Sequence, residues 1–109
     1  MEILPLAQEE NIGVISYSPL GAGLLTGKYT TDSKPEQGRL VENDMYIRRY
    51  GVDAYYEIAE DFAEYARERG MEPATLAVAW VKSHPAVTAP IIGARNVEQL
   101  EDSLAALEV

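Results

Sequence analysis

The chain has 109 residues, of which 47% are apolar, and it contains no cysteine. This composition fits one globular domain, excludes disulfides and thiolate metal sites, and favours a cytoplasmic location. The 18 acidic and 9 basic residues give a formal net charge of −9, which argues against general binding to nucleic-acid phosphates. The acidic amino-terminal stretch and the short apolar runs indicate neither a signal peptide nor a membrane span.

The first predicted elements are a helix over residues 2–10 and a strand over residues 12–17. Apolar side chains recur at helical spacing in the first segment, and Asn11 is a suitable helix stop because asparagine tolerates the left-handed conformation. The second segment, IGVISY, is apolar and rich in β-branched residues. A strand that is apolar on both faces is typical of a parallel sheet covered by helices.

A glycine-rich stretch, SPLGAGLLTGKYT, follows at residues 18–30. It does not fit a P-loop, because Tyr29 stands where Ser or Thr is required. It does not fit the dinucleotide fingerprint either, because Thr26 occupies the third glycine position. We therefore predict a loop over residues 18–44, and a loop of this length in a small domain is usually functional or disordered.

Two helices are predicted next, over residues 53–69 and 73–83. Acidic residues form the solvated face of the first helix, and Gly70 follows its end. The second helix begins with Pro73 and is apolar almost all round, so we expect it to be buried, with Trp80 packed in the core. His84 falls in a turn and is expected to be a surface residue. The predicted inward stripe of the first helix is Ile58, Phe62, Tyr65 and Ala66.

The last two predicted elements are a strand over residues 87–92 and a helix over residues 97–107. Pro90 lacks a backbone N–H, so it belongs at the start of the strand or at an unpaired edge. Asn96 is the expected N-cap, and Gln99 three residues later suggests a capping box. The predicted inward stripe of this helix is Val97, Leu100, Leu104 and Leu107.

Strands that alternate with helices predict a parallel α/β fold. Two strands do not make a stable sheet alone, and each would carry an unpaired edge. The pattern is therefore typical of one part of a larger α/β architecture.

The stretch IGVISYSPLGAGLLTGKY resembles the seventh strand and following loop of an aldo-keto reductase. HPAVTAPIIGARNVEQLEDSLAAL resembles the eighth strand, its loop and the closing helix of the same family. The resemblance extends over residues 1–109. It implies the C-terminal part of a (β/α)8 TIM barrel, with two parallel strands and flanking helices, incomplete as a stand-alone barrel.

The resemblance also implies part of an NADP(H) site. Tyr17 would stack on the nicotinamide, the loop after it would line the diphosphate with Lys28 alongside, and Arg39 would close over the cofactor. Arg95 would bind the 2′-phosphate of the adenosine. This chain has Asp102-Ser103 where the family often has Glu-Asn. The full implied set is Tyr17, Ser18, Pro19, Leu20, Gly21, Ala22, Lys28, Arg39, Gly93, Ala94, Arg95, Gln99 and Asp102.

The catalytic Asp, Tyr, Lys and His of the family have no counterpart in the motifs of this chain. We therefore expect no hydride transfer by the chain alone, and a small carbonyl substrate only in a complete barrel. Self-association, or pairing with the missing barrel portion, is the expected partnership. A non-catalytic self-associating module and a remnant reading frame remain alternatives. The residues alone also allow plainer interpretations, with Tyr17 as a packing residue, Arg95 as a surface charge and the glycines as simple turns.

Overall fold

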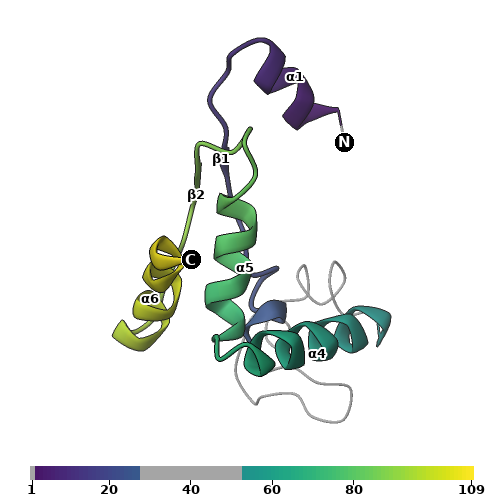
Figure 1. The fold of residues 1–109 in the computed structure, drawn as a ribbon, viewed down its shortest axis with the longest axis vertical. Helices are drawn as coiled ribbons and strands as arrows, with labels where there is room; N and C mark the ends of the chain where they lie inside the picture. Colours follow the sequence, from purple (N-terminus) through teal and green to yellow (C-terminus); the bar gives the residue numbers. More distant parts are fainter. Residues whose placement is uncertain (1, 28–52) are drawn as a thin grey trace.

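A computed structural model describes residues 2–27 and 53–109 of the chain. Helices and a small parallel sheet form a mixed α/β arrangement, as the sequence predicts (Figure 1). Helix α5 stands beside the strands, α6 flanks it, and α4 crosses beneath its lower end. In chain order the elements are α1 (Ile3–Glu9), β1 (Ile15–Ser16), the 3₁₀-helix η1 (Leu24–Thr26), α4 (Asp53–Glu68), α5 (Pro73–Lys82), β2 (Ala89–Pro90), α6 (Val97–Leu104) and the 3₁₀-helix η2 (Ala105–Glu108).

The two strands pair in parallel, with Ile15 opposite Ala89 and Ser16 opposite Pro90. Parallel pairing needs a long crossover, which α4 and α5 supply between the strands. Both strands are only two residues long, shorter than the predicted spans 12–17 and 87–92. Pro90 ends β2 rather than beginning it, and its nitrogen lies on the unpaired edge of the strand, the other predicted placement. The sheet has only these two strands among the described residues, so each strand has one free edge.

Hydrogen bonds extend the contact between the strand segments beyond the ladder itself. The N–H of Thr88 donates to the carbonyl of Val14 at 2.8 Å, and the N–H of Ile91 donates to the carbonyl of Ser16 at 2.6 Å. The N–H of Val14 in turn donates to Oγ1 of Thr88 at 3.0 Å. A side-chain hydroxyl thus holds the amino-terminal end of the pair in register.

The helix boundaries follow local signals in the sequence. Asn11 and Gly70 have φ angles of 56° and 69°, the left-handed conformation that ends a helix. Pro73 is the first residue of α5, where its missing N–H leaves no helical bond unmade. Asn96 caps α6, and its side chain accepts from the N–H of Gln99. These four boundary predictions are confirmed.

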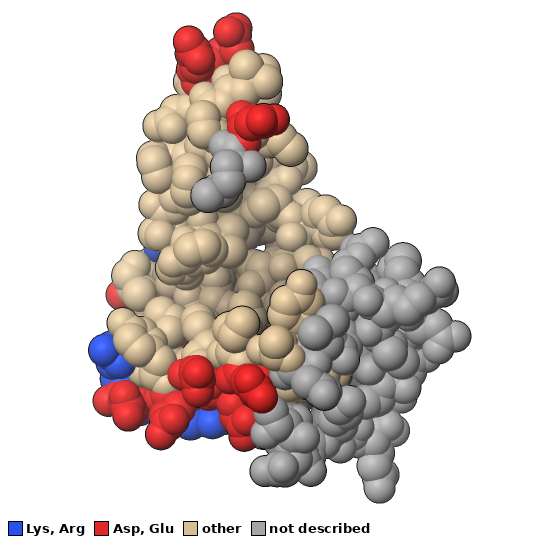
Figure 2. All heavy atoms as spheres, turned by 90° about the vertical axis from the view of Figure 1, so that its right-hand side faces the viewer, with Lys and Arg blue, Asp and Glu red and all other residues tan. Residues whose placement is uncertain are grey.

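The predicted inward stripe of α4 is correct at Ala66, which is buried, but wrong at Ile58 and Tyr65. Ile58 and Tyr65 are 62% and 49% exposed. The buried face is Tyr56, Ala59, Ala63 and Ala66. Three of these four residues are alanines, which allow neighbouring backbone to approach closely. The glycine-rich loop packs on this face through Ala22 and Leu24. Acidic side chains keep the opposite face in water, as predicted, and Figure 2 shows them gathered over α4 and α1.

The large apolar residues of α5 and α6 also differ from prediction. Trp80 is 74% exposed rather than packed in the core. In the last helical segment, Ser103 and Ala106 are buried, whereas the predicted stripe of Val97, Leu100, Leu104 and Leu107 is exposed. Helices α5 and α6 meet through small residues, and Oγ1 of Thr75 donates to the carbonyl of Asp102 at 2.6 Å. This close approach leaves the longer side chains outside the contact.

Two small clusters of buried residues lie in the part of the chain that the structure describes. One contains Ala22, Leu24, Tyr56 and Ala59, with Leu25 packed against it. The other contains Val78, Ala79 and Ala106, with Leu20 and Ile92 packed against it. Both clusters include residues from the stretch 18–27. The glycine-rich loop is therefore part of the core as well as part of the surface.

None of the helices within 2–27 and 53–109 is both long enough and apolar enough to cross a membrane.

Candidate functional site

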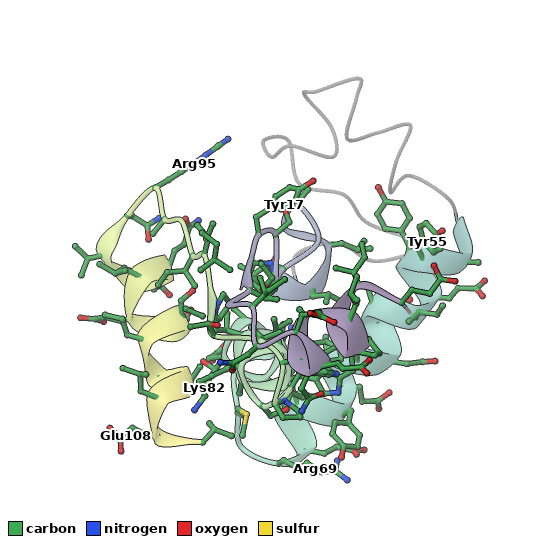
Figure 3. The ribbon with its side chains drawn as sticks, turned by 90° about the horizontal axis from the view of Figure 1, so that it is seen from above. Tyr17, Tyr55, Arg69, Lys82, Arg95 and Glu108 are labelled. Atoms are coloured by element: carbon green, nitrogen blue, oxygen red, sulfur yellow. The ribbon has the colours of Figure 1, made fainter. Side chains whose placement is uncertain are left out.

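The candidate site lies at the carboxyl ends of the two paired strands. Tyr17 directly follows β1, and residues 93–95 connect β2 to α6. Because the strands are parallel, their carboxyl ends meet at the same edge of the sheet. Figure 3 shows the side chains of Tyr17 and Arg95 directed toward the same side of the molecule. Tyr17 is 72% exposed, so its ring is available to a ligand.

The glycine-rich loop reverses the chain immediately after Tyr17. Ser18, Gly21, Ala22 and Gly23 have φ angles of 57°, 57°, 58° and 93°. Two of these four residues are not glycine, so the loop holds an uncommon backbone conformation at Ser18 and Ala22. The N–H of Gly21 donates to the carbonyl of Ser18 at 3.1 Å, which closes the first turn.

Core contacts hold this loop in place. Leu20 packs on the cluster of Val78, Ala79 and Ala106, whereas Ala22 and Leu24 pack on the cluster around Tyr56. The N–H of Leu25 donates to the carbonyl of Leu20 at 3.0 Å and closes the loop from the other side. The loop is therefore fixed to α4 and α5 at once.

Gly27 ends the described part of the loop in a conformation that favours glycine. Its φ angle is 88°. A Cβ built there would lie 2.6 Å from Nη2 of Arg67 and 3.2 Å from Cγ of Pro73. The chain thus passes tightly over the junction of α4 and α5. The sequence shows Gly27 only as one of the glycines of the glycine-rich stretch. Nothing in the neighbouring residues indicates that it packs against Arg67 and Pro73.

Backbone donors are available on the loop. The N–H groups of Ser18, Leu20 and Gly23 make no hydrogen bond to any other residue that the structure describes. Successive N–H groups in left-handed and turn conformations form concave sites that suit anions. The arrangement can therefore present donors to a phosphate, although its sequence matches neither familiar glycine motif.

The second strand leads into a well-formed helix cap. The N–H of Gln99 donates to Oδ1 of Asn96 at 2.9 Å, and the N–H of Arg95 donates to Oε1 of Gln99 at 2.9 Å. The predicted pairing of Asn96 with Gln99 is confirmed. The side-chain amide oxygen of Gln99, however, accepts from the backbone N–H of Arg95 instead of that of Asn96. The backbone of Arg95 is thus held while its side chain stays exposed.

The remaining predicted residues fall into four groups. Pro19, Leu20 and Gly21 are half-buried in the loop, and Gly93 and Ala94 are exposed next to Arg95. Asp102 lies one helical turn beyond Gln99, on the side where its carbonyl accepts from Thr75. Lys28 and Arg39 lie outside the described residues. Sequence reasoning missed the Thr75 contact, because a threonine inside an apolar helix gives no sign of its partner.

His84 has the turn role that the sequence predicts. It is exposed, and its Nδ1 accepts from the N–H of Ala86 at 3.1 Å. In the described part of the chain, no group of three or more His, Cys, Asp or Glu side chains is placed to hold a metal ion.

Parallel strands with a glycine-rich loop and a capped helix at their carboxyl ends form the arrangement in which α/β proteins commonly place their ligand loops. The model of the aldo/keto reductase family matches residues 1–109. The chain belongs to this family of oxidoreductases.

Curated relatives support this membership. The chain is 38% identical over 109 residues to the uncharacterized oxidoreductase YrpG of Bacillus subtilis, covering 100% of this chain and 31% of that protein. It is 36% identical over 110 residues to a probable voltage-gated potassium channel subunit beta of Arabidopsis thaliana, covering 99% and 34%. It is 32% identical over 109 residues to the L-glyceraldehyde 3-phosphate reductase of Escherichia coli K12, covering 96% and 31%. The chain spans about a third of the length of these relatives.

Proposed function

We propose that residues 1–109 form the C-terminal segment of an aldo-keto reductase (β/α)8 barrel and supply part of its NADP(H) site. The observation that carries the proposal is the common direction of Tyr17 and Arg95 at the carboxyl ends of two paired strands (Figure 3). Ligand loops of such barrels lie at this end of the strands.

The loop after β1 would hold the nicotinamide half of the cofactor. The exposed ring of Tyr17 offers a flat face for stacking on the nicotinamide. The N–H groups of Ser18 and Leu20 would donate to the diphosphate, with Pro19, Gly21 and Ala22 shaping the turn. Lys28 and Arg39 would add positive charge from outside the described residues.

The loop after β2 would hold the adenosine half. The guanidinium of Arg95 can donate two parallel hydrogen bonds to a 2′-phosphate, which gives preference for NADP(H) over NAD(H). A Cβ added at Gly93 would meet no atom within 4 Å, so the approach to Ala94 and Arg95 is open. Because Oε1 of Gln99 accepts from Arg95, Gln99 would reach the adenosine through Nε2. Asp102 would contact the same moiety.

The chemistry assigned to the chain is limited to binding and orientation. Bound NADPH supplies a hydride for the reduction of an aldehyde or ketone carbonyl. Tyr17 would orient the nicotinamide, and the two loops would exclude water from one side of it. The proton donor and the other catalytic groups of the family have no counterpart in this chain, so we propose that it is inactive alone. A cytoplasmic location agrees with NADPH use and with the absence of cysteine.

Calorimetric titration of the chain with NADPH and NADH tests the proposal. We expect tighter binding of NADPH, and Arg95→Ala should lower the NADPH affinity to that for NADH. Arg69→Ala is the matched control, because Arg69 is also an exposed arginine but lies on the ring of Tyr65 at the end of α4. Equal affinity for the two cofactors, or equal loss in both variants, would contradict the assignment of Arg95.

A further inference from the structure

The two ligand loops, residues 18–27 and 93–95, have one support in common, which we call the shared cluster. It consists of Val78, Ala79 and Ala106, each no more than 5% exposed. Leu20 of the first loop packs against the shared cluster, and so does Ile92, which directly precedes the second loop. A close-packed interior transmits displacement, because it has few voids to absorb it. A movement of one loop on this support therefore disturbs the other.

The two loops also leave the sheet from positions that are bonded to each other. The N–H of Ile91 donates to the carbonyl of Ser16 at 2.6 Å, just before the loops begin. Beyond this bond, the side chains of Tyr17 and Arg95 are exposed and come from different loops (Figure 3). The shared cluster, beneath these exposed side chains, is therefore the connection through the core that the two loops have in common.

We infer that the shared cluster couples the two halves of the ligand site, with Leu20 and Ile92 as its positioning residues. Ordering of one loop fixes the shared cluster and so lowers the entropic cost of ordering the other loop. A ligand that orders only residues 93–95 then favours binding at the first loop, although it contacts no atom there. The inference rests on the proposed NADP(H) site, because that proposal assigns both loops to one ligand.

Two neighbouring residues support the same segments without joining them. Leu25 belongs to the first loop but packs against the other cluster, around Tyr56. Among the described residues, that other cluster includes none from β2 or from the loop after it. Ile91 adjoins Ile92 in the chain, but its side chain is 50% exposed and is not part of the shared cluster. Truncation of Leu25 or Ile91 therefore separates coupling between the loops from simple loss of apolar contact.

Amide hydrogen exchange of the chain without ligand, followed by NMR, tests the coupling. Ile92→Ala should accelerate exchange of the Leu25 N–H, which donates to the carbonyl of Leu20 at 3.0 Å in the other loop. Leu20→Ala should in turn accelerate exchange of the Arg95 N–H, which donates to Oε1 of Gln99. We expect an effect of about 5-fold or more in each direction, because coupling between two sites is reciprocal.

Ile91→Ala and Leu25→Ala are the matched controls for these two variants. Ile91→Ala should leave the exchange of the Leu25 N–H unchanged, and Leu25→Ala should leave that of the Arg95 N–H unchanged. The N–H of Gly70 donates to the carbonyl of Arg67 at 2.9 Å at the end of α4 and reports on loosening of the whole fold. Its exchange should stay the same in every variant.

A second measurement adds 2′-AMP, which carries the phosphate proposed to bind Arg95 but has neither a nicotinamide nor a diphosphate. At saturation we expect it to slow exchange of the Leu25 N–H by about 5-fold in the parent chain. The same ligand should leave this exchange unchanged in Ile92→Ala, where the connection to the shared cluster is lost. Circular dichroism checks that each variant is folded, and Ile92→Val repeats the measurement with a smaller truncation.

Four results would overturn the inference: no effect of either variant on the opposite loop, equal effects in the control variants, equal acceleration at Gly70, or bound 2′-AMP without protection of Leu25. The first three are measured without ligand, so they decide the coupling independently of the proposed NADP(H) site. Failure of 2′-AMP to bind would refute the proposed adenosine half of that site, and the ligand-free exchange would still decide whether the loops are coupled.

Discussion

The backbone N–H of Arg95 is bonded to Oε1 of Gln99 at 2.9 Å, one turn inside the helix that Arg95 precedes. Asn96 lies between them and accepts from the N–H of Gln99. The two bonds cross the start of α6 and fix the direction in which the chain leaves β2. Arg95 thus has a fixed backbone and an exposed side chain, a combination that suits a residue that must meet a ligand.

Removal of the cap should weaken both the fold and the site. Asn96→Ala deletes the acceptor for Gln99, and we expect it to lower the free energy of unfolding by about 1 kcal/mol. Urea denaturation followed by circular dichroism measures this change. Asn96→Asp keeps an acceptor at the same position and should remain close to the parent. A loss of the same size in Asn96→Asp would show that the cap bond is not the cause.

Substitution of Gly27 should destabilise the fold more than substitution of Gly93. Gly27→Ala places a Cβ against Arg67 and Pro73 at a φ angle of 88°. We expect it to lower the free energy of unfolding by more than about 1 kcal/mol. Gly93→Ala is the matched control, because its Cβ would meet no atom within 4 Å. Thermal unfolding of both variants decides the comparison, and similar stability for the two would contradict the packing described around Gly27.

Replacement of Ser16 should stabilise the folded chain. Its Oγ is buried and makes no hydrogen bond in the part of the chain that the structure describes. Ser16→Ala removes this unsatisfied hydroxyl, so we expect the free energy of unfolding to rise by about 1 kcal/mol. Thr75→Val is the contrasting variant, because it removes a hydroxyl that does donate, to the carbonyl of Asp102. It should destabilise the chain by a similar amount, and urea midpoints that move the same way in both variants would contradict this interpretation.

Tyr17 should act through its ring rather than its hydroxyl. Tyr17→Phe keeps a stacking surface, so we expect it to bind NADPH as well as the parent chain does. Tyr17→Ala should weaken NADPH binding by about 10-fold, the effect of losing one aromatic stacking partner. Because Tyr17 is 72% exposed, neither change should alter the melting temperature. A loss of affinity in Tyr17→Phe would point instead to a hydrogen bond from the hydroxyl.

The sequence predicted those features that depend on a few neighbouring residues. The helix ends at Asn11 and Gly70, the start at Pro73 and the cap at Asn96 are determined by backbone preferences that act locally. The order of strands and helices followed from the alternation of β-branched and helical segments. Parallel pairing of the strands then places Tyr17 and Arg95 at the same edge of the sheet, and their roles in binding are proposals.

The buried helix faces were not predictable in the same way. A search for periodic apolar residues favours large side chains, so it selected Ile58 and Leu104. The structure buries Ala59, Ala63 and Ala106 instead, because neighbouring backbone reaches those positions. Which face of a helix is covered depends on its partner, and local periodicity does not contain that information. The predicted strands are too long for a related reason, since apolar β-branched residues continue beyond the short ladder that forms.

The alanine-rich contacts of α4 and η2 set which sequence changes the fold can accept. A core of large side chains is most sensitive to truncation, because truncation leaves a cavity. Ala59, Ala66 and Ala106 are each no more than 1% exposed, and an alanine has almost no volume to lose. At these positions steric clash is the limit, because valine or leucine would push the elements apart. Substitutions at these buried alanines are therefore limited by the size of the new side chain.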